Sequence, residues 1–85
     1  EFVKIFEVFP NPTQGRFTIS LQFAEETFAT LSIWEVLTGK IIKQINLDEG
    51  DNFLVNVDLL PLPPGAYILR MDYRGGVRYL RFVVN

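Results

Sequence analysis

The sequence predicts an all-β domain, an immunoglobulin-like β-sandwich of about seven antiparallel strands in two sheets. Apolar and polar residues alternate with a period of two in several short segments, which is typical of half-buried strands. Valine, isoleucine, phenylalanine and threonine dominate these segments, as strands prefer. Turn-forming residues separate the segments at close spacing, and helical periodicity is missing. We therefore expect residues 1–85 to form a single domain of this class.

The seven predicted strands follow one another with only short breaks. They cover residues 2–9, 16–23, 29–34, 40–47, 52–57, 66–73 and 77–84. Turns or exposed connections are predicted at residues 10–15, 25–27, 38–39, 48–51, 61–65 and 75–76, where proline, glycine or acidic residues gather. The second strand has the clearest pattern, because every second residue from Phe17 to Phe23 is large and apolar. The same alternation places Ile41, Ile45 and Leu47 on one face of the fourth strand.

The alternation also predicts which side chains form the core. We expect burial of Phe17, Ile19, Leu31, Ile33, Val55, Val57, Leu69 and Phe82. Three glycines, at positions 15, 39 and 65, follow or form turns. A positive φ angle or a close approach of the backbone is expected at each of them, because glycine accommodates both without steric cost.

The last two strands are predicted to form a hairpin with Gly75-Gly76 as its loop, since a glycine pair suits a tight turn. This register places Arg70 opposite Arg81, and it places both on the outer face with Arg74. Residues 60–85 hold four arginines and one aspartate (4 − 1 = +3), whereas residues 1–59 hold four basic and nine acidic residues (4 − 9 = −5). The hairpin is therefore predicted to be a basic patch on an acidic body.

The composition argues against several functional classes. The chain has neither cysteine nor histidine and a formal charge of −2. It thus lacks the commonest general base, the commonest metal ligand and a thiol nucleophile, so we expect no enzyme, metal site or cofactor. The negative charge argues against nucleic-acid binding. No segment is apolar for long enough to span a membrane as a helix.

Other residues suggest binding but have simpler interpretations. Asp48, Glu49 and Asp51 offer oxygen ligands for calcium, but a polar turn explains them better. The P-x-x-P spacing of residues 61–64 suits an aromatic groove, but a rigid crossover is the simpler interpretation. Exposed aromatic residues could stack on sugar rings. The candidates for such stacking are Trp34, Tyr73 and Tyr79.

Four blocks of the chain, taken in order, resemble one family. They are VFPNPTQGRFTI at residues 8–19, LSIWEVLTGK at residues 31–40, LPLPPGAYIL at residues 60–69 and GVRYLRFVV at residues 76–84. Together they resemble the type A C-terminal sorting domain of the type IX (Por) secretion system of Bacteroidetes. The sequence departs from the family at Trp34 and Glu35, where Tyr and Asp are usual. It departs again at residues 62–64, which lengthen the proline loop, and at Arg81, where lysine is common.

The resemblance implies that the domain is a non-catalytic signal at the end of a secreted precursor. Its partners would be the preceding cargo domain and the translocon and sortase proteins of the type IX system. The cargo would cross the periplasm and reach the outer-membrane surface or the medium, where a sortase usually removes the domain. The abrupt start at Glu1 suggests a cut boundary, and Asn85 directly after a strand suggests a terminus.

The candidate recognition residues combine the family motifs with the C-terminal arginines. They are Pro10, Asn11, Pro12, Gly15, Gly39, Gly65, Tyr67, Arg70, Arg74, Arg78 and Arg81. The alternative hypothesis is a non-catalytic structural or carbohydrate-binding module within a cell-surface enzyme. A spacer of that kind would have further sequence after it, whereas a sorting domain ends its polypeptide.

Overall fold

The computed structural model describes residues 1–85 and confirms the all-β class. All strand pairings are antiparallel. The strands are β1 (Val3–Phe9), β2 (Arg16–Glu35), β3 (Ile41–Asp58), β4 (Gly65–Tyr73) and β5 (Gly76–Val84). No helix of the length and hydrophobicity needed to cross a bilayer is present.

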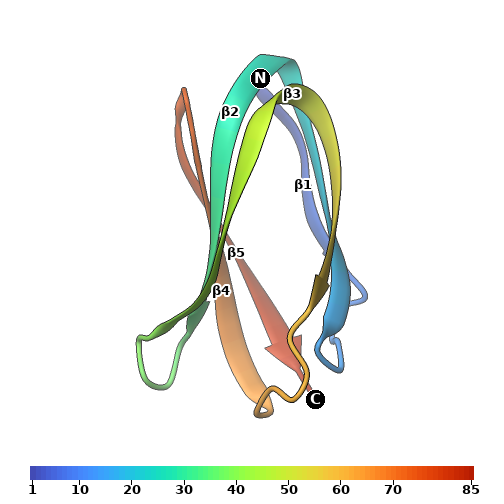
Figure 1. The fold of residues 1–85 in the computed structure, drawn as a ribbon, viewed down its shortest axis with the longest axis vertical. Coiled ribbons are helices and arrows are strands. Elements are labelled where there is room, and N and C mark those ends of the chain that lie inside the picture. Colours follow the sequence, from blue (N-terminus) through green and yellow to red (C-terminus); the bar gives the residue numbers. More distant parts are fainter.

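Two of the predicted connections are wrong, because residues 25–27 and 48–51 lie inside β2 and β3. The seven predicted segments therefore merge into five strands. β2 and β3 bend together as a pair (Figure 1), with Thr27 opposite Gly50 and register shifts on both sides of Thr27. Such bulges bend a strand while its pairing continues. The polar residues can thus remain exposed at the bend without ending the strand.

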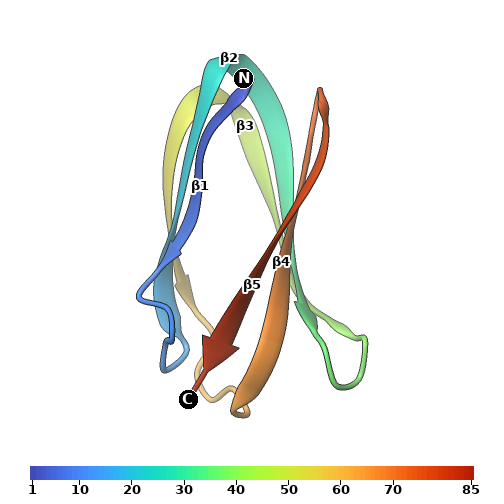
Figure 2. The ribbon, with the colours of Figure 1, turned by 180° about the vertical axis from the view of Figure 1, so that it is seen from behind.

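The bend divides the molecule into two layers (Figures 1 and 2). One layer has three strands: β1, the first half of β2 and the second half of β3. The other has four, in the order β3, β2, β4 and β5, built from the opposite halves of β3 and β2. We call these the three-stranded layer and the four-stranded layer.

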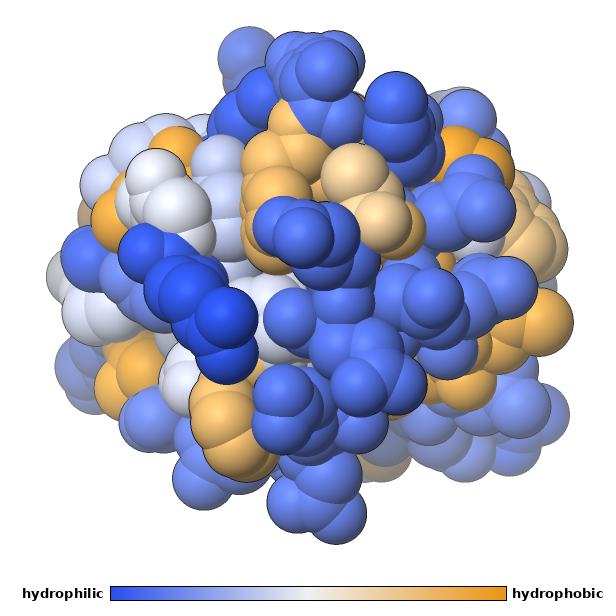
Figure 3. Space-filling view, turned by 90° about the horizontal axis from the view of Figure 1, so that it is seen from above, coloured by the Kyte–Doolittle hydropathy of each residue, from blue (hydrophilic) through white to orange (hydrophobic).

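The two ends of the molecule differ. The bend end holds the bends of β2 and β3, the N-terminus and the tip of the β4–β5 hairpin (Figure 1). The loop end holds the connections at residues 10–15, 36–40 and 59–64, together with the C-terminus. Viewed from above, the bend end is mostly hydrophilic and is interrupted by a few apolar patches (Figure 3). The longest dimension of the molecule is 36 Å, so these ends are well separated.

The core lies between the two layers. The residues predicted to be buried are buried, except Val55, which is half-buried on the edge strand β3. Aromatic rings link the layers near the loop end: the Phe82 ring centroid lies 4.9 Å from that of Phe17 and 5.7 Å from that of Tyr67. The period-two pattern therefore identified the inward-facing side chains correctly.

The prediction for Ile41 is wrong in detail. Ile45 and Leu47 pack against the core, but Ile41 is 46% exposed. The register of β2 and β3 shifts between Ile33 and Trp34, so that Ile41 pairs with Trp34. A one-residue shift moves a side chain to the other face of a strand. Ile41 therefore lies beside Trp34 on the outer face of the four-stranded layer.

The predicted register of the terminal hairpin is also wrong, by two residues. Tyr73 pairs with Gly76, which leaves Arg74-Gly75 as the loop, and Arg70 lies opposite Tyr79 instead of Arg81. A shift of two keeps the same side chains inside, so the core does not oppose it. It replaces a repulsive Arg–Arg pair with a cation–π contact, because the Arg70 Cζ atom lies 5.9 Å from the Tyr79 ring centroid.

Candidate functional site

The loop end brings the first and last family blocks together. Residues 10–15 lie beside the end of β5, where Thr13 and Val84 form a parallel bridge. The Thr13 N–H donates to the Val83 carbonyl at 2.9 Å, and the Asn85 N–H donates to the Thr13 carbonyl at 2.8 Å. The Asn11 side-chain oxygen accepts from the Val83 N–H at 3.1 Å. We call these contacts the clasp; they connect the proline-containing loop to the final strand.

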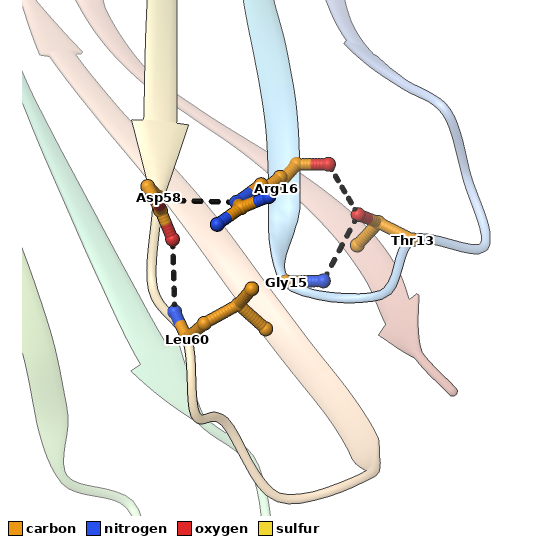
Figure 4. Close-up of polar contacts among 5 residues, drawn as sticks. All are labelled: Thr13, Gly15, Arg16, Asp58 and Leu60. Atoms are coloured by element: carbon orange, nitrogen blue, oxygen red, sulfur yellow. Dashed lines mark hydrogen bonds and ion pairs between the residues drawn. The ribbon is translucent and has the colours of Figure 1, made fainter.

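Thr13 is the centre of the clasp, and its side chain is almost completely buried. The Thr13 hydroxyl donates to the Arg16 carbonyl at 2.7 Å and accepts from the Gly15 N–H at 3.2 Å (Figure 4). A side-chain oxygen that satisfies nearby backbone groups stabilises a tight turn. The hydroxyl thus fixes the shape of the turn that leads into β2.

A second set of contacts attaches the connection at residues 59–64 to the same turn. The Leu59 N–H donates to the Gly15 carbonyl at 2.9 Å. Asp58 accepts from the Leu60 N–H at 3.2 Å and from Arg16 Nε at 3.1 Å (Figure 4). The hydrogen bond from the Leu60 backbone, followed by the contribution of Arg16, lowers the pKa of Asp58. The ionised carboxylate therefore holds the two loops together.

The three glycines expected to have a positive φ angle or a close backbone approach all have positive φ angles: 112° at Gly15, 70° at Gly39 and 151° at Gly65. Gly15 is also sterically confined, because a Cβ atom there would lie 2.7 Å from Leu60 Cδ2. Around Gly39 and Gly65 such an atom would meet nothing within 4 Å. Gly15 thus serves both backbone conformation and loop packing, whereas the other two serve conformation alone.

Tyr67 closes the core beneath the connection at residues 59–64. Its side chain is fully buried, and its hydroxyl donates to the Pro63 carbonyl at 2.5 Å. Burial, and secondarily the negative charge of Glu35, raises the pKa of Tyr67. Tyr67 also borders a hollow of about 340 Å³ between the connections at residues 36–40 and 59–64. Leu37 lines this hollow and is 90% exposed, so the loop end has an accessible apolar surface.

A pair of shallow hollows flanks the proline loop. They have volumes of about 430 and 420 Å³ and share Pro10 and Arg16. Pro12 lines the second hollow. The proline side chains therefore face solvent, while Asn11 and Thr13 of the same loop bind β5.

The four C-terminal arginines do not form one patch. Arg70 is paired with Asp72 at 2.9 Å, Arg74 lies 3.9 Å from Glu49, and Arg78 is paired with Glu1 at 2.7 Å. Arg81 forms no ion pair. Arg78 pairs in register with the buried Met71, so it leans towards the N-terminus, away from the outer face. Most of the predicted positive patch is therefore neutralised by neighbouring carboxylates.

The N-terminal residues extend the folded unit beyond β1. The Phe2 ring stacks on Tyr73 with a centroid distance of 5.8 Å and lies 5.7 Å from Phe23. Its carbonyl accepts from the Ala24 N–H at 2.8 Å. The Glu1–Arg78 ion pair adds a contact from the N-terminus to β5. These contacts join the two layers at the bend end, as the clasp joins them at the loop end. Tyr73 is thus a packing residue of the bend end.

The structure therefore gathers the motif positions Pro10, Asn11, Pro12, Gly15, Gly39, Gly65 and Tyr67 at the loop end. It places Arg74 and Arg78 towards the bend end. Sequence reasoning missed Thr13 and Asp58 as organising residues. Thr13 lies inside the PNPT motif, which is a usable signal. The pairing of Asp58 with Arg16 joins residues 42 positions apart, and no local pattern indicates it. No three acidic side chains are grouped so as to hold a metal ion.

Comparison with known families identifies the chain. The sequence model of the secretion system C-terminal sorting domain matches residues 7–85. The chain therefore belongs to this family, and it is a C-terminal sorting signal for type IX secretion. Such a signal implies a cargo protein that is secreted or displayed at the cell surface. No curated protein matches the sequence.

Proposed function

We propose that this domain is a non-catalytic signal that is recognised in its folded state, through the surface of the loop end. The observation that carries this proposal is the convergence of distant family blocks. Asn11 and Val83 are 72 positions apart and share a hydrogen bond. A surface that exists only when both blocks are folded together can distinguish a folded domain from an unfolded chain.

The position of the N-terminus supports this proposal. β1 starts at the bend end, so a preceding cargo domain would join the molecule there (Figures 1 and 2). The loop end lies at the opposite pole and is free of that connection. A translocon component could therefore bind the loop end without meeting the cargo.

We further propose the pathway that the family suggests for this chain. The precursor crosses the periplasm, the outer-membrane translocon of the type IX system binds the domain, and a surface sortase then removes it. The anchored N-terminal residues favour a cut before β1, because cleavage within β1 would require that strand to leave the sheet. The cargo then remains at the outer-membrane surface or in the medium.

A secretion reporter tests the proposal. The reporter carries a signal peptide and ends with this domain, and it is expressed in a bacterium that has a type IX system. Leu37→Asp alters the loop end, and Phe28→Asp is the matched control at the bend end, since these side chains are 90% and 59% exposed. Substitutions at such exposed positions usually change stability by no more than about 0.5 kcal/mol.

We expect the Leu37→Asp reporter to fold and accumulate in the periplasm, while the Phe28→Asp reporter reaches the surface. Arg81→Glu tests the contribution of the unpaired arginine in the same assay. If a folded Leu37→Asp reporter is delivered normally, the hollow lined by Leu37 and Tyr67 is not part of the recognised surface. If the unaltered fusion fails to leave the periplasm in several such hosts, the sorting function itself is refuted for this chain.

A further inference from the structure

The outer face of the four-stranded layer carries aromatic and polar side chains that lie outside the loop end. Trp34 lies on this face in β2, and Tyr79 lies on it in β5, where it is 64% exposed. These strands are separated by β4 alone. Trp34 is in register with Ile68 and Arg81, and Tyr79 lies two residues from Arg81 along β5, so the two aromatic residues are offset diagonally by about 12 Å. Trp34 is half-buried, so the face is a rigid support for one exposed and one partly exposed aromatic ring.

Both rings are fixed by polar contacts. The Trp34 Nε1–H donates to the Ser32 hydroxyl at 2.9 Å, which sets the orientation of the indole plane. Arg70 lies over the Tyr79 ring and is itself held by Asp72 through contacts of 2.9, 3.0 and 3.3 Å. Because these rings are already ordered, a ligand that stacks on them loses little side-chain entropy on binding.

Trp34 and Arg70 line two adjacent hollows in this face. The smaller hollow has a volume of about 180 Å³ and is lined by hydroxyl, amide and carboxylate groups of Thr30, Ser32, Gln44 and Asp72. The larger hollow, of about 400 Å³, extends over Ile68 to Tyr79. The smaller hollow lies below the range of about 300–1,000 Å³ that is common for drug-sized ligands. The volume of the smaller hollow suits a single sugar ring with several hydroxyl groups.

A pyranose ring has an apolar face of C–H groups and a rim of hydroxyl groups. An aromatic plane beside hydrogen-bonding side chains complements both features. The charges on this face refine the match. Arg70 is neutralised by Asp72, whereas Arg81, two residues after Tyr79 on the same face of β5, forms no ion pair. Arg81 is in register with Ile68, so its unpaired guanidinium complements a carboxylate at the β5 edge of this face.

We infer that this face binds an acidic oligosaccharide. One sugar ring stacks on Trp34 in the smaller hollow, the chain crosses Ile68, and an acidic sugar reaches Tyr79 and Arg81. Trp34 and Tyr79 provide stacking, and Gln44, Thr30 and Asp72 provide hydrogen bonds to hydroxyl groups. This binding would be an additional activity of the domain and does not depend on its role in sorting.

The single tryptophan of the chain makes the proposal directly measurable. The complete domain is titrated with a tetrasaccharide of galacturonic acid and, separately, with the neutral tetrasaccharide of galactose. We expect saturable changes in tryptophan emission with both, and tighter binding of the acidic one. Calorimetry then measures the variants. Trp34→Ala and Tyr79→Ser should each weaken binding by about tenfold, the loss typical of one aromatic contact.

Two further variants separate stacking from folding and charge. Trp34→Phe keeps an aromatic plane and should retain most of the affinity, provided that its unfolding midpoint is unchanged. Arg81→Gln should weaken binding of the acidic tetrasaccharide and leave binding of the neutral one unchanged. Leu54→Ala is the control, because Leu54 is 71% exposed in the three-stranded layer.

Several results would overturn the proposal. The first is the absence of saturable binding of either tetrasaccharide. The second is a folded Trp34→Ala variant that binds as tightly as the unaltered domain. The third is a Leu54→Ala variant that loses as much affinity as Trp34→Ala. An Arg81→Gln variant that binds the acidic tetrasaccharide normally would overturn its acidic character. If the aromatic variants bind both sugars normally but block delivery of the secretion reporter, the face docks a protein instead.

Discussion

Replacement of Thr13 by valine tests whether the clasp stabilises the fold. Valine has nearly the same shape, so Thr13→Val creates no cavity. It removes the hydroxyl that donates to the Arg16 carbonyl at 2.7 Å and accepts from the Gly15 N–H at 3.2 Å. Each such hydrogen bond contributes about 1 kcal/mol, and a buried partner left unsatisfied increases the cost. We therefore expect the free energy of unfolding to fall by about 2–3 kcal/mol.

Urea denaturation measures this loss, and the slope of the unfolding free energy against urea should stay unchanged. For a domain of this size the melting temperature should fall by roughly 8–16 °C for a loss of 2 kcal/mol. Thr18→Val is the matched control, because the Thr18 hydroxyl bonds only to exposed Asn56. It should change stability by no more than about 0.5 kcal/mol.

Hydrogen exchange locates the effect of Thr13→Val within the molecule. The amides of Val83 and Asn85 are bonded to Asn11 and Thr13, respectively. If the distorted turn releases the end of β5, these amides should exchange faster than those in the centre of β4. A stability loss below about 0.5 kcal/mol would refute the importance of the hydroxyl. Unchanged exchange of Asn85 relative to β4 would refute its link to the final strand.

Two further stability predictions concern the loop end. Gly15→Ala should cost about 1–3 kcal/mol in urea unfolding, because the positive φ is strained and the added Cβ meets Leu60. Gly39→Ala carries the strain alone and should cost less; equal costs would contradict the packing argument. Tyr67→Phe should cost about 1 kcal/mol near neutral pH, by loss of the bond to Pro63. Because burial raises the pKa of Tyr67, its contribution is fully present below its ordinary value of 10.0 and is lost as pH rises towards the folded value. The phenylalanine variant should therefore lose less stability above pH 10 than the parent, as alkaline denaturation would show.

The period-two pattern was sufficient to assign the faces of the strands. Leu31 and Ile33 are buried as predicted because alternation is a local property of a strand. The bend at Thr27 could not be predicted in this way. Consecutive polar residues indicate a loop when the chain is considered alone, whereas here the partner strand continues opposite them. Whether such residues end a strand is thus decided by non-local pairing.

The hairpin shows a second limit of sequence reasoning. A two-residue shift leaves the buried set unchanged, so the pattern of Leu69, Met71 and Phe82 fits both registers equally. The difference lies in which side chain faces Arg70, a weak effect of a few tenths of a kcal/mol to about 1 kcal/mol. The pairing of the arginines with Asp72, Glu49 and Glu1 likewise depends on the folded arrangement. The charge count alone therefore overstated the basic character of this region.

The clasp explains why a signal of this kind would need the whole domain. A peptide with only the final block, residues 76–84, lacks Asn11 and Thr13 and cannot hold its end in the same position. A peptide with only the proline loop lacks the strand that Thr13 binds. If the loop end is recognised, as we propose, neither block suffices alone, and unfolding in the periplasm erases the signal. Stability of the clasp and recognition by the translocon would then be selected together, so a sorting defect is informative only in variants whose unfolding has been measured.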